Sequence, residues 1–181
     1  MRRDWIVTAA HVVQVDGQNR STLFARFTNH IDNEVQVKVL AVHRENDIAI
    51  LQIISANNPC KQPLYPGYDE LSVTHGLICC GYTPLNNKAI TATLAQVYDK
   101  DYRERQNTEI VLEFESDVFE GGASGGPIFG NGGVVLGIMI NLFSTEDQPD
   151  KSFVRATSIE NLMIGMKVDF DTNILKSYSD R

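Results

Sequence analysis

Cysteine, basic charge and long apolar runs are all scarce in this sequence. Its three cysteines, Cys60, Cys79 and Cys80, include an adjacent pair, and neighbouring cysteines bridge only in a strained ring. They therefore do not form a secreted disulfide framework, and no Cys–His spacing suits a zinc site. Sixteen Lys and Arg stand against twenty-three Asp and Glu, which argues against binding nucleic acid by neutralising phosphates. No run approaches the roughly 20 apolar residues of a membrane helix, so we expect neither nucleic acid nor membrane as a partner.

The first residues imitate a secretory signal only weakly. Met1-Arg2-Arg3-Asp4 precedes a short apolar stretch, but that stretch contains His11 and lacks a small-residue cleavage site. We therefore expect a cytoplasmic protein, or one from which an export segment has been removed.

The size and the distribution of charge suggest two lobes. A chain of 181 residues, 43% hydrophobic, can bury a substantial core as one domain or as two small lobes sharing an interface. Residues 1–58 hold six basic and six acidic side chains, whereas residues 59–181 hold ten and seventeen, so the net charge of -7 belongs to the second part. Residues 56–68 carry three of the six prolines and little patterning, which is typical of a linker. We predict an N-terminal lobe over 1–58 and a C-terminal lobe over 59–181.

Period-two patterning dominates the chain and predicts an all-β fold. Val35, Val37 and Val39 alternate with polar residues, as in a strand with one buried face. Short apolar runs of strand length occupy residues 48–51, 77–80, 110–112 and 134–136. Turn sequences separate the strands at residues 16–17, 66–67, 86–87 and 130–133. Many short strands with turns between them indicate a sandwich or a barrel.

One helix is predicted near the C-terminus. Ile159, Leu162, Met163 and Met166 fall at helical spacing on one apolar stripe. Thr157, followed three residues later by a glutamate, has the spacing of a capping box that would start this helix.

Three segments carry residues that suit catalysis. Residues 5–13 form a β-rich run that contains His11, residues 46–51 place Asp47 at the start of an apolar strand, and residues 120–128 set Ser124 among glycines. Glycines on both sides of a serine let consecutive N–H groups converge on one point, where they can stabilise the oxyanion of acyl transfer. A serine hydroxyl also needs a base to take its proton, and a histidine base needs a carboxylate to orient it.

These segments, in this order, closely resemble the chymotrypsin-like (trypsin-like) serine peptidases. The matching sequences are Thr-Ala-Ala-His at 8–11, Asn-Asp-Ile-Ala-Ile-Leu at 46–51 and Ala-Ser-Gly-Gly-Pro-Ile at 123–128. Their separations also fit, at thirty-six residues from His11 to Asp47 and seventy-seven from Asp47 to Ser124. Residues 76–84, 115–117 and 152–156 resemble segments of the bacterial HtrA/Deg-type branch.

The resemblance implies a fold and a set of roles. The fold would be two packed antiparallel β-barrels, and the activity a serine endopeptidase that acts on peptides or proteins without a metal or organic cofactor. Ser124 would be the nucleophile, His11 the general base and acid, and Asp47 the orienting carboxylate. The N–H groups of Gly122 and Ser124 would form the oxyanion hole.

Substrate-binding residues follow from the same resemblance. Val118 would form the base of the first specificity pocket, which would then suit small or medium aliphatic side chains, and Phe153 and Val154 would lie on the strand beside the substrate. A register shifted by one residue would instead place Asp117 at the base, where a basic side chain would fit. Arg155 is either part of the opposite wall or a solvated strand arginine.

The sequence departs from the family pattern in three places. Ala123 replaces the aspartate that trypsin pairs with a freed N-terminus, so activation by that ion pair is not expected. The sequence reaches the histidine motif almost at once, so we expect the first barrel to be incomplete, without the family's usual leading strands. A partner chain, an upstream region or a reduced barrel would each explain this. The sequence after the predicted helix is also too short for the PDZ domain of HtrA proteins. A non-catalytic or assembly-activated module that binds peptides or partner proteins is therefore the alternative function.

Overall fold

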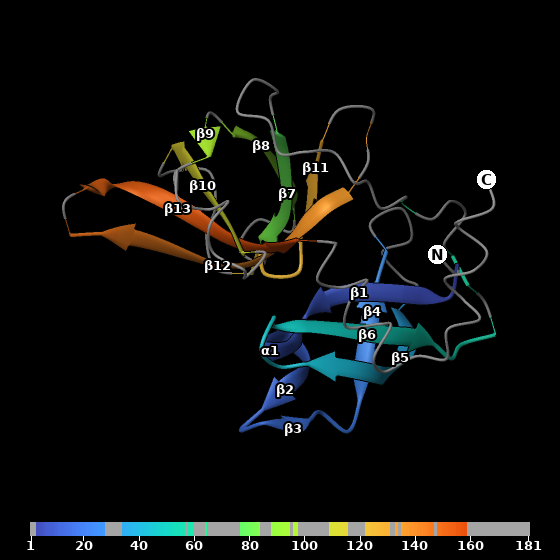
Figure 1. Cartoon of the computed structure of the whole chain (residues 1–181). Coiled ribbons are helices and arrows are strands. Elements are labelled where there is room, and N and C mark those ends of the chain that lie inside the picture. Colours follow the sequence, from blue (N-terminus) through green and yellow to red (C-terminus); the bar gives the residue numbers. More distant parts are fainter. Residues whose placement is uncertain are drawn as a thin grey trace, which may run out of the picture.

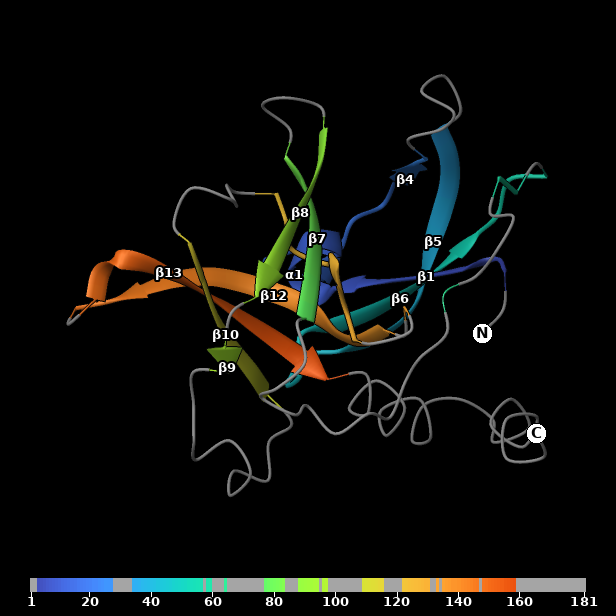
Figure 2. The same ribbon diagram turned by 90° about the horizontal axis from the view of Figure 1, so that it is seen from above.

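Two large β-sheets and a two-stranded hairpin make up most of the described part of the chain, whose structure is a computed structural model (Figures 1 and 2). The structure describes residues 3–27, 34–56, 58–59, 64, 77–83, 88–94, 96–97, 109–115, 122–130, 133, 135–146 and 148–158. One sheet falls within residues 5–53 and the other within residues 77–158. The predicted lobe boundary after residue 58 lies between the two sheets and stays a prediction.

The N-terminal sheet has four antiparallel strands in the order β1-β6-β5-β4. In chain order these are β1 (Trp5–Ala9), β4 (Leu23–Arg26), β5 (Glu34–His43) and β6 (Ile48–Ile53). Between β1 and β4 come the short helix α1 (Ala10–Val13) and a hairpin of β2 (Gln14–Val15) and β3 (Gln18–Asn19). Val35 and Val37 in β5 are buried while their neighbours are exposed, which confirms the alternating strand.

The C-terminal sheet has seven strands in the order β8-β7-β11-β12-β13-β10-β9. They are β7 (Leu77–Thr83), β8 (Lys88–Leu94), β9 (Gln96–Val97), β10 (Glu109–Glu115), β11 (Pro127–Phe129), β12 (Val135–Thr145) and β13 (Gln148–Ser158). All neighbouring strands are antiparallel, and the sheet curls strongly on itself (Figure 1). The predicted strands at 77–80 and 110–112 are confirmed, and the run at 134–136 enters β12.

Among the described residues, two clusters of apolar side chains stabilise these sheets. One lies on the N-terminal sheet and α1 and includes Ala10, Val13 and Leu51. The other joins the two sheets, because Trp5, Ile48 and Ile50 of the first sheet pack with Val135 and Ile138 of β12. Complete burial of such a side chain contributes about 1.5–3 kcal/mol, so this shared cluster fixes the two sheets against each other.

Helix α1 is the one helix in the described ranges, and the sequence did not predict it. Its four residues, Ala-His-Val-Val, continue an apolar run that is typical of a strand, and its N-cap residue makes no side-chain hydrogen bond. The helix predicted from Ile159 to Met166 lies outside the described residues. No helix in the part of the chain that the structure describes is long and apolar enough to cross a membrane.

Candidate active site

His11 and Asp47 meet because two antiparallel strands have neighbouring ends. Ala9, the last residue of β1, pairs with Ile48, the first residue of β6. The residues that follow Ala9 and precede Ile48 therefore leave the sheet side by side, and the Ala10 N–H donates to the Asp47 carbonyl at 3.0 Å. Strand pairing thus brings together two side chains thirty-six positions apart.

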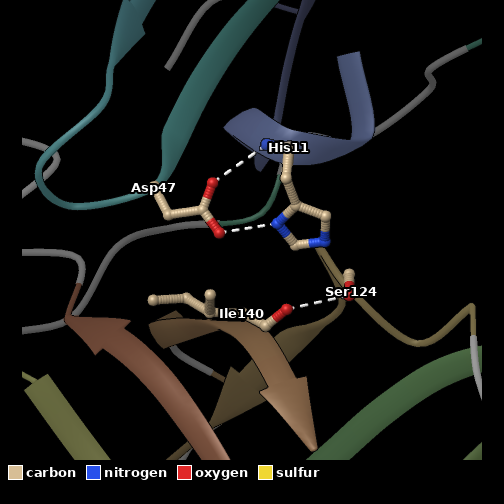
Figure 3. A network of polar contacts seen from close by, with 4 residues as sticks. All are labelled: His11, Asp47, Ser124 and Ile140. Atoms are coloured by element: carbon tan, nitrogen blue, oxygen red, sulfur yellow. Dashed lines mark hydrogen bonds and ion pairs between the residues drawn. The ribbon is translucent and has the colours of Figure 1, made fainter. Parts of the chain in front are cut away.

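Both carboxylate oxygens of Asp47 accept hydrogen bonds from His11 (Figure 3). The backbone N–H of His11 donates to Oδ1 at 2.9 Å, and ring atom Nδ1 lies 2.6 Å from Oδ2. A carboxylate only accepts, so Nδ1 carries the proton in this contact. In the neutral ring Nε2 is then an acceptor, which is the tautomer required of a base. The His11 side chain is 49% exposed and that of Asp47 23%, so the ring is open to a bound molecule while the carboxylate is more enclosed.

Asp47 is presented by a tight turn after β5. Its N–H donates to the Arg44 carbonyl at 3.2 Å, and its backbone has a φ of 50°, in the left-handed region. Aspartate and asparagine tolerate this region better than most residues, because their short polar side chains bond locally. In this turn, which lies between β5 and β6, the Asp47 carboxylate points toward α1.

The loop of Ser124 packs directly against β1, the strand that precedes His11. At Gly125 (φ +87°) a Cβ would lie 2.3 Å from Thr8 Oγ1, and at Gly126 it would lie 2.1 Å from the Cys80 carbonyl oxygen. Only glycine permits both approaches. Two backbone hydrogen bonds, Gly125 N–H to Met139 O and Met139 N–H to Gly126 O, both at 2.8 Å, fasten the loop to β12.

The Ser124 hydroxyl donates to the Ile140 carbonyl at 2.8 Å (Figure 3). Ile140 sits at a β-bulge, because Met139 pairs with Ala156 and Asn141 already pairs with Arg155. Bulges interrupt the ladder and are enriched beside active sites. Among the hydrogen bonds of the described residues, none joins Ser124 to His11. The three predicted triad members are thus gathered from both lobes, with the serine hydroxyl on a different acceptor.

Gly122 and Ser124, the two residues predicted to form the oxyanion hole, flank Ala123 in the serine loop. Gly122 has a φ of 110°, a conformation that side chains rarely adopt, and Ala123 between them is buried at 3% exposure. The backbone hydrogen bonds within the described ranges include none donated by the N–H of Gly122 or Ser124. Ala123 is a small buried apolar residue at the position where trypsin has an aspartate.

The predicted substrate-binding residues are only partly described. Val118, with its alternative Asp117, lies outside the described residues. Phe153 and Val154 lie on β13, where their backbones pair with Phe143 and Leu142 of β12, and their side chains are not described. The described side chains include no group of three or more His, Cys, Asp or Glu that could hold a metal ion.

Two polar contacts of this site were not anticipated from the sequence. The Ile140 carbonyl accepts a hydrogen bond from Ser124, and the Arg44 carbonyl accepts one from Asp47. Both acceptors are backbone groups, which every residue has, so the residue types do not reveal them. Only the glycines after Ser124 hinted that the loop approaches other backbone closely.

Comparison with known proteins identifies the family. Residues 1–138 match the trypsin-like peptidase domain. The chain belongs to the trypsin-like peptidases. It is therefore a serine endopeptidase, a hydrolase whose relatives act on peptides or proteins, as the three ordered motifs predicted. No curated protein sequence matched the chain.

Solved structures show the same fold. The active form of the Rv3671c protease from M. tuberculosis aligns with a TM-score of 0.63 and 24% identity over 94% of this chain and 71% of that one. The inactive form of the same protease aligns with a TM-score of 0.62 and 24% sequence identity, over 93% of this chain and 80% of that one. The HtrA-type protease AlgW with a decapeptide aligns with a TM-score of 0.64 and 17% sequence identity, over 92% of this chain and 49% of that one. These likenesses confirm the predicted chymotrypsin-like all-β fold, which this trypsin-like peptidase shares with HtrA-type proteases.

Proposed function

We propose that this trypsin-like peptidase cleaves peptide bonds with Ser124 as nucleophile, His11 as general base and acid, and Asp47 as the orienting carboxylate. The observation that carries the proposal is the contact between His11 Nδ1 and Asp47 Oδ2 at 2.6 Å. It holds the ring with Nε2 free to accept a proton, as a serine nucleophile requires.

The first half of the reaction forms an acyl-enzyme. The Ser124 hydroxyl exchanges its acceptor from the Ile140 carbonyl to His11 Nε2, and Oγ attacks the substrate carbonyl carbon while Nε2 takes the proton. The resulting oxyanion is stabilised by the N–H groups of Gly122 and Ser124, each such donor being worth about 2.7–4 kcal/mol of barrier. The C–N bond then breaks, the departing amine receives the proton from His11, and an ester with Ser124 remains.

The second half repeats these steps with water. His11 Nε2 takes a proton from a water molecule, whose oxygen attacks the ester carbonyl. Collapse of the second oxyanion breaks the bond to Oγ, and Ser124 recovers its proton from His11. The products are a carboxylic acid and an amine, and the enzyme is regenerated without a cofactor.

Strand β12 offers the edge along which a peptide would lie. Strand β11 pairs with β12 only as far as Ile138, whereas β13 pairs with β12 as far as Thr145. Beyond Ile138 the other edge of β12 faces the serine loop, among the described strands, and an extended peptide can add to such an edge through its backbone. Within this proposal Val118 forms an apolar pocket base, and Phe153 and Val154 lie on the neighbouring strand.

A covalent probe tests the mechanism. The purified protein, its Ser124→Ala and His11→Ala variants and a Ser21→Ala control are treated with a fluorophosphonate. We expect labelling of the wild type and of the Ser21→Ala control, since Ser21 is an exposed residue between β3 and β4. Equal labelling of the Ser124→Ala variant would contradict the assignment. Cleavage of a peptide library then decides between Val118 and Asp117 as pocket base.

An assembly-activated module is the second candidate, and the position of the Ser124 hydroxyl favours it. The hydroxyl donates to Ile140 and not to His11, so the site needs one rearrangement before attack. Among the described strands, β1 and β4 are also the outer strands of the first sheet, where a partner chain could add. Labelling that occurs only after a candidate partner is added would support this function over a self-sufficient enzyme.

A further inference from the structure

Arg44 links the turn of Asp47 to the hairpin that follows His11. Its Nη2 donates to the Gly17 carbonyl at 2.6 Å, across twenty-seven positions of sequence. Arg44 lies directly after β5 and is exposed, so burial does not account for its placement. A hydrogen bond from a charged donor is stronger than a neutral one.

The acceptor of this bond is held rigidly. Asp16 and Gly17 have φ values of 49° and 73° and connect the paired residues Val15 and Gln18. Positive φ at both central residues is the mark of a type I′ hairpin turn, which matches the twist of its strands and fixes where the Gly17 carbonyl points.

The hairpin is in turn fastened to the helix that carries His11. The Arg20 N–H donates to the carbonyl of Val13, the last residue of α1, at 2.9 Å. Within the hairpin, the Gln14 side chain of β2 donates to Asn19 Oδ1 of β3 at 2.8 Å. The bond from Arg20, together with the direct chain connection from Val13 to Gln14, ties the hairpin to α1 and so relates the position of the Gly17 carbonyl to that of His11.

Arg44 closes a ring of contacts around the His11–Asp47 pair. Its own carbonyl accepts the Asp47 N–H, its guanidinium reaches Gly17, and the hairpin leads back through α1 to His11. Asp47 has a left-handed backbone, which costs free energy in a residue other than glycine, so the contacts around the turn help to hold it. Apart from the side chains of His11, Asp47 and the hairpin, this ring uses the Arg44 side chain, whose guanidinium connects the turn of Asp47 to the hairpin.

We propose that Arg44 is a positioning residue, which holds the turn of Asp47 at the distance and angle that the His11–Asp47 contact requires. This inference rests on the proposed triad. Small displacements of catalytic groups are costly in rate, so loosening the turn lowers turnover while leaving the peptide-binding edge of β12 intact.

The test compares Arg44→Met, which keeps the length but removes the donors, with Arg44→Lys and with Arg20→Ala. Arg20→Ala removes a neighbouring positive charge but keeps its backbone contact. We expect Arg44→Met to lower kcat about tenfold with KM within twofold, as for the loss of one charge-assisted hydrogen bond. Lysine should restore part of kcat, and Arg20→Ala should match the wild type. The downfield proton resonance of His11 Nδ1–H should move or broaden in Arg44→Met alone.

Two outcomes overturn this role. One is an Arg44→Met enzyme with wild-type kcat and an unchanged His11 resonance. The other is a loss that lysine does not reverse and that follows a lowered Tm, which marks a merely structural residue. If the wild type itself shows no turnover and no fluorophosphonate labelling, the proposed triad has failed, and that result is distinct from a failure of Arg44.

Discussion

Asp47 makes three hydrogen bonds to α1, two through its carboxylate and one through its backbone carbonyl. Its two carboxylate oxygens hold the His11 N–H and ring, and its carbonyl accepts the Ala10 N–H. These contacts need the carboxylate in one orientation, and the left-handed backbone at φ 50° provides it. An asparagine would keep the backbone and the shape but would replace one acceptor with a donor.

Asp47→Asn should therefore retain the fold and lose most of its turnover. The amide group can face Nδ1 with a donor, which favours the tautomer whose Nε2 carries the proton and cannot act as base. We expect kcat to fall by ~10⁴-fold, the loss typical of this change in Ser-His-Asp sites. Hydrolysis of a fluorogenic peptide measures it, with Asp16→Asn as control because asparagine suits the same turn. Turnover within tenfold of the wild type would exclude Asp47 from the triad.

At the scale of elements, the serine loop is placed by its contacts with β1 and β12. Gly125 touches Thr8 of β1, and backbone hydrogen bonds tie the loop to Met139 of β12. Strands β5 and β6 could be predicted from their alternating or continuous apolar residues. Helix α1 could not be predicted, because its four residues are too few to show the helical spacing of apolar residues.

Gly125→Ala should destabilise the protein by about 2–4 kcal/mol, since it combines overpacking with strain at a positive φ. The new Cβ would lie 2.3 Å from Thr8 Oγ1. Gly133→Ala is the matched control, because Gly133 has a φ of +75° but open space around its Cβ, so only strain remains. Urea unfolding compares the two, and equal losses would show that the contact with Thr8 is unimportant. A Thr8→Ala change should recover part of the Gly125→Ala loss.

At the scale of the molecule, the candidate site depends on the interface between the lobes. His11 and Asp47 belong to the first sheet and Ser124 to the second, and the shared cluster of Trp5, Ile48, Ile138 and their neighbours joins these sheets. The sheets therefore keep their relative position through side chains that take no part in catalysis.

Ile138→Ala should lower the free energy of unfolding by about 2–5 kcal/mol. Ile138 is 4% exposed and lies in the cluster between the lobes, so its loss leaves a cavity there. Because the cluster couples the lobes, we expect one cooperative transition at a lower Tm. Ile54→Ala is the control, since Ile54 is 46% exposed and its replacement should cost under about 1 kcal/mol. Equal losses in the two variants would contradict a shared core.

The sequence by itself determined the strands with regular patterns, the presence of a turn at Asp16-Gly17 and the three ordered motifs with His11, Asp47 and Ser124. Each of these depends on residue identity over a few neighbouring positions. The tertiary structure alone decided that β1 and β6 end together, that Ser124 donates to Ile140 and that Arg44 reaches Gly17. These contacts join residues far apart in the chain, and several use backbone carbonyls, which are the same in every residue. Strand pairing and loop packing place them, and no local pattern encodes that.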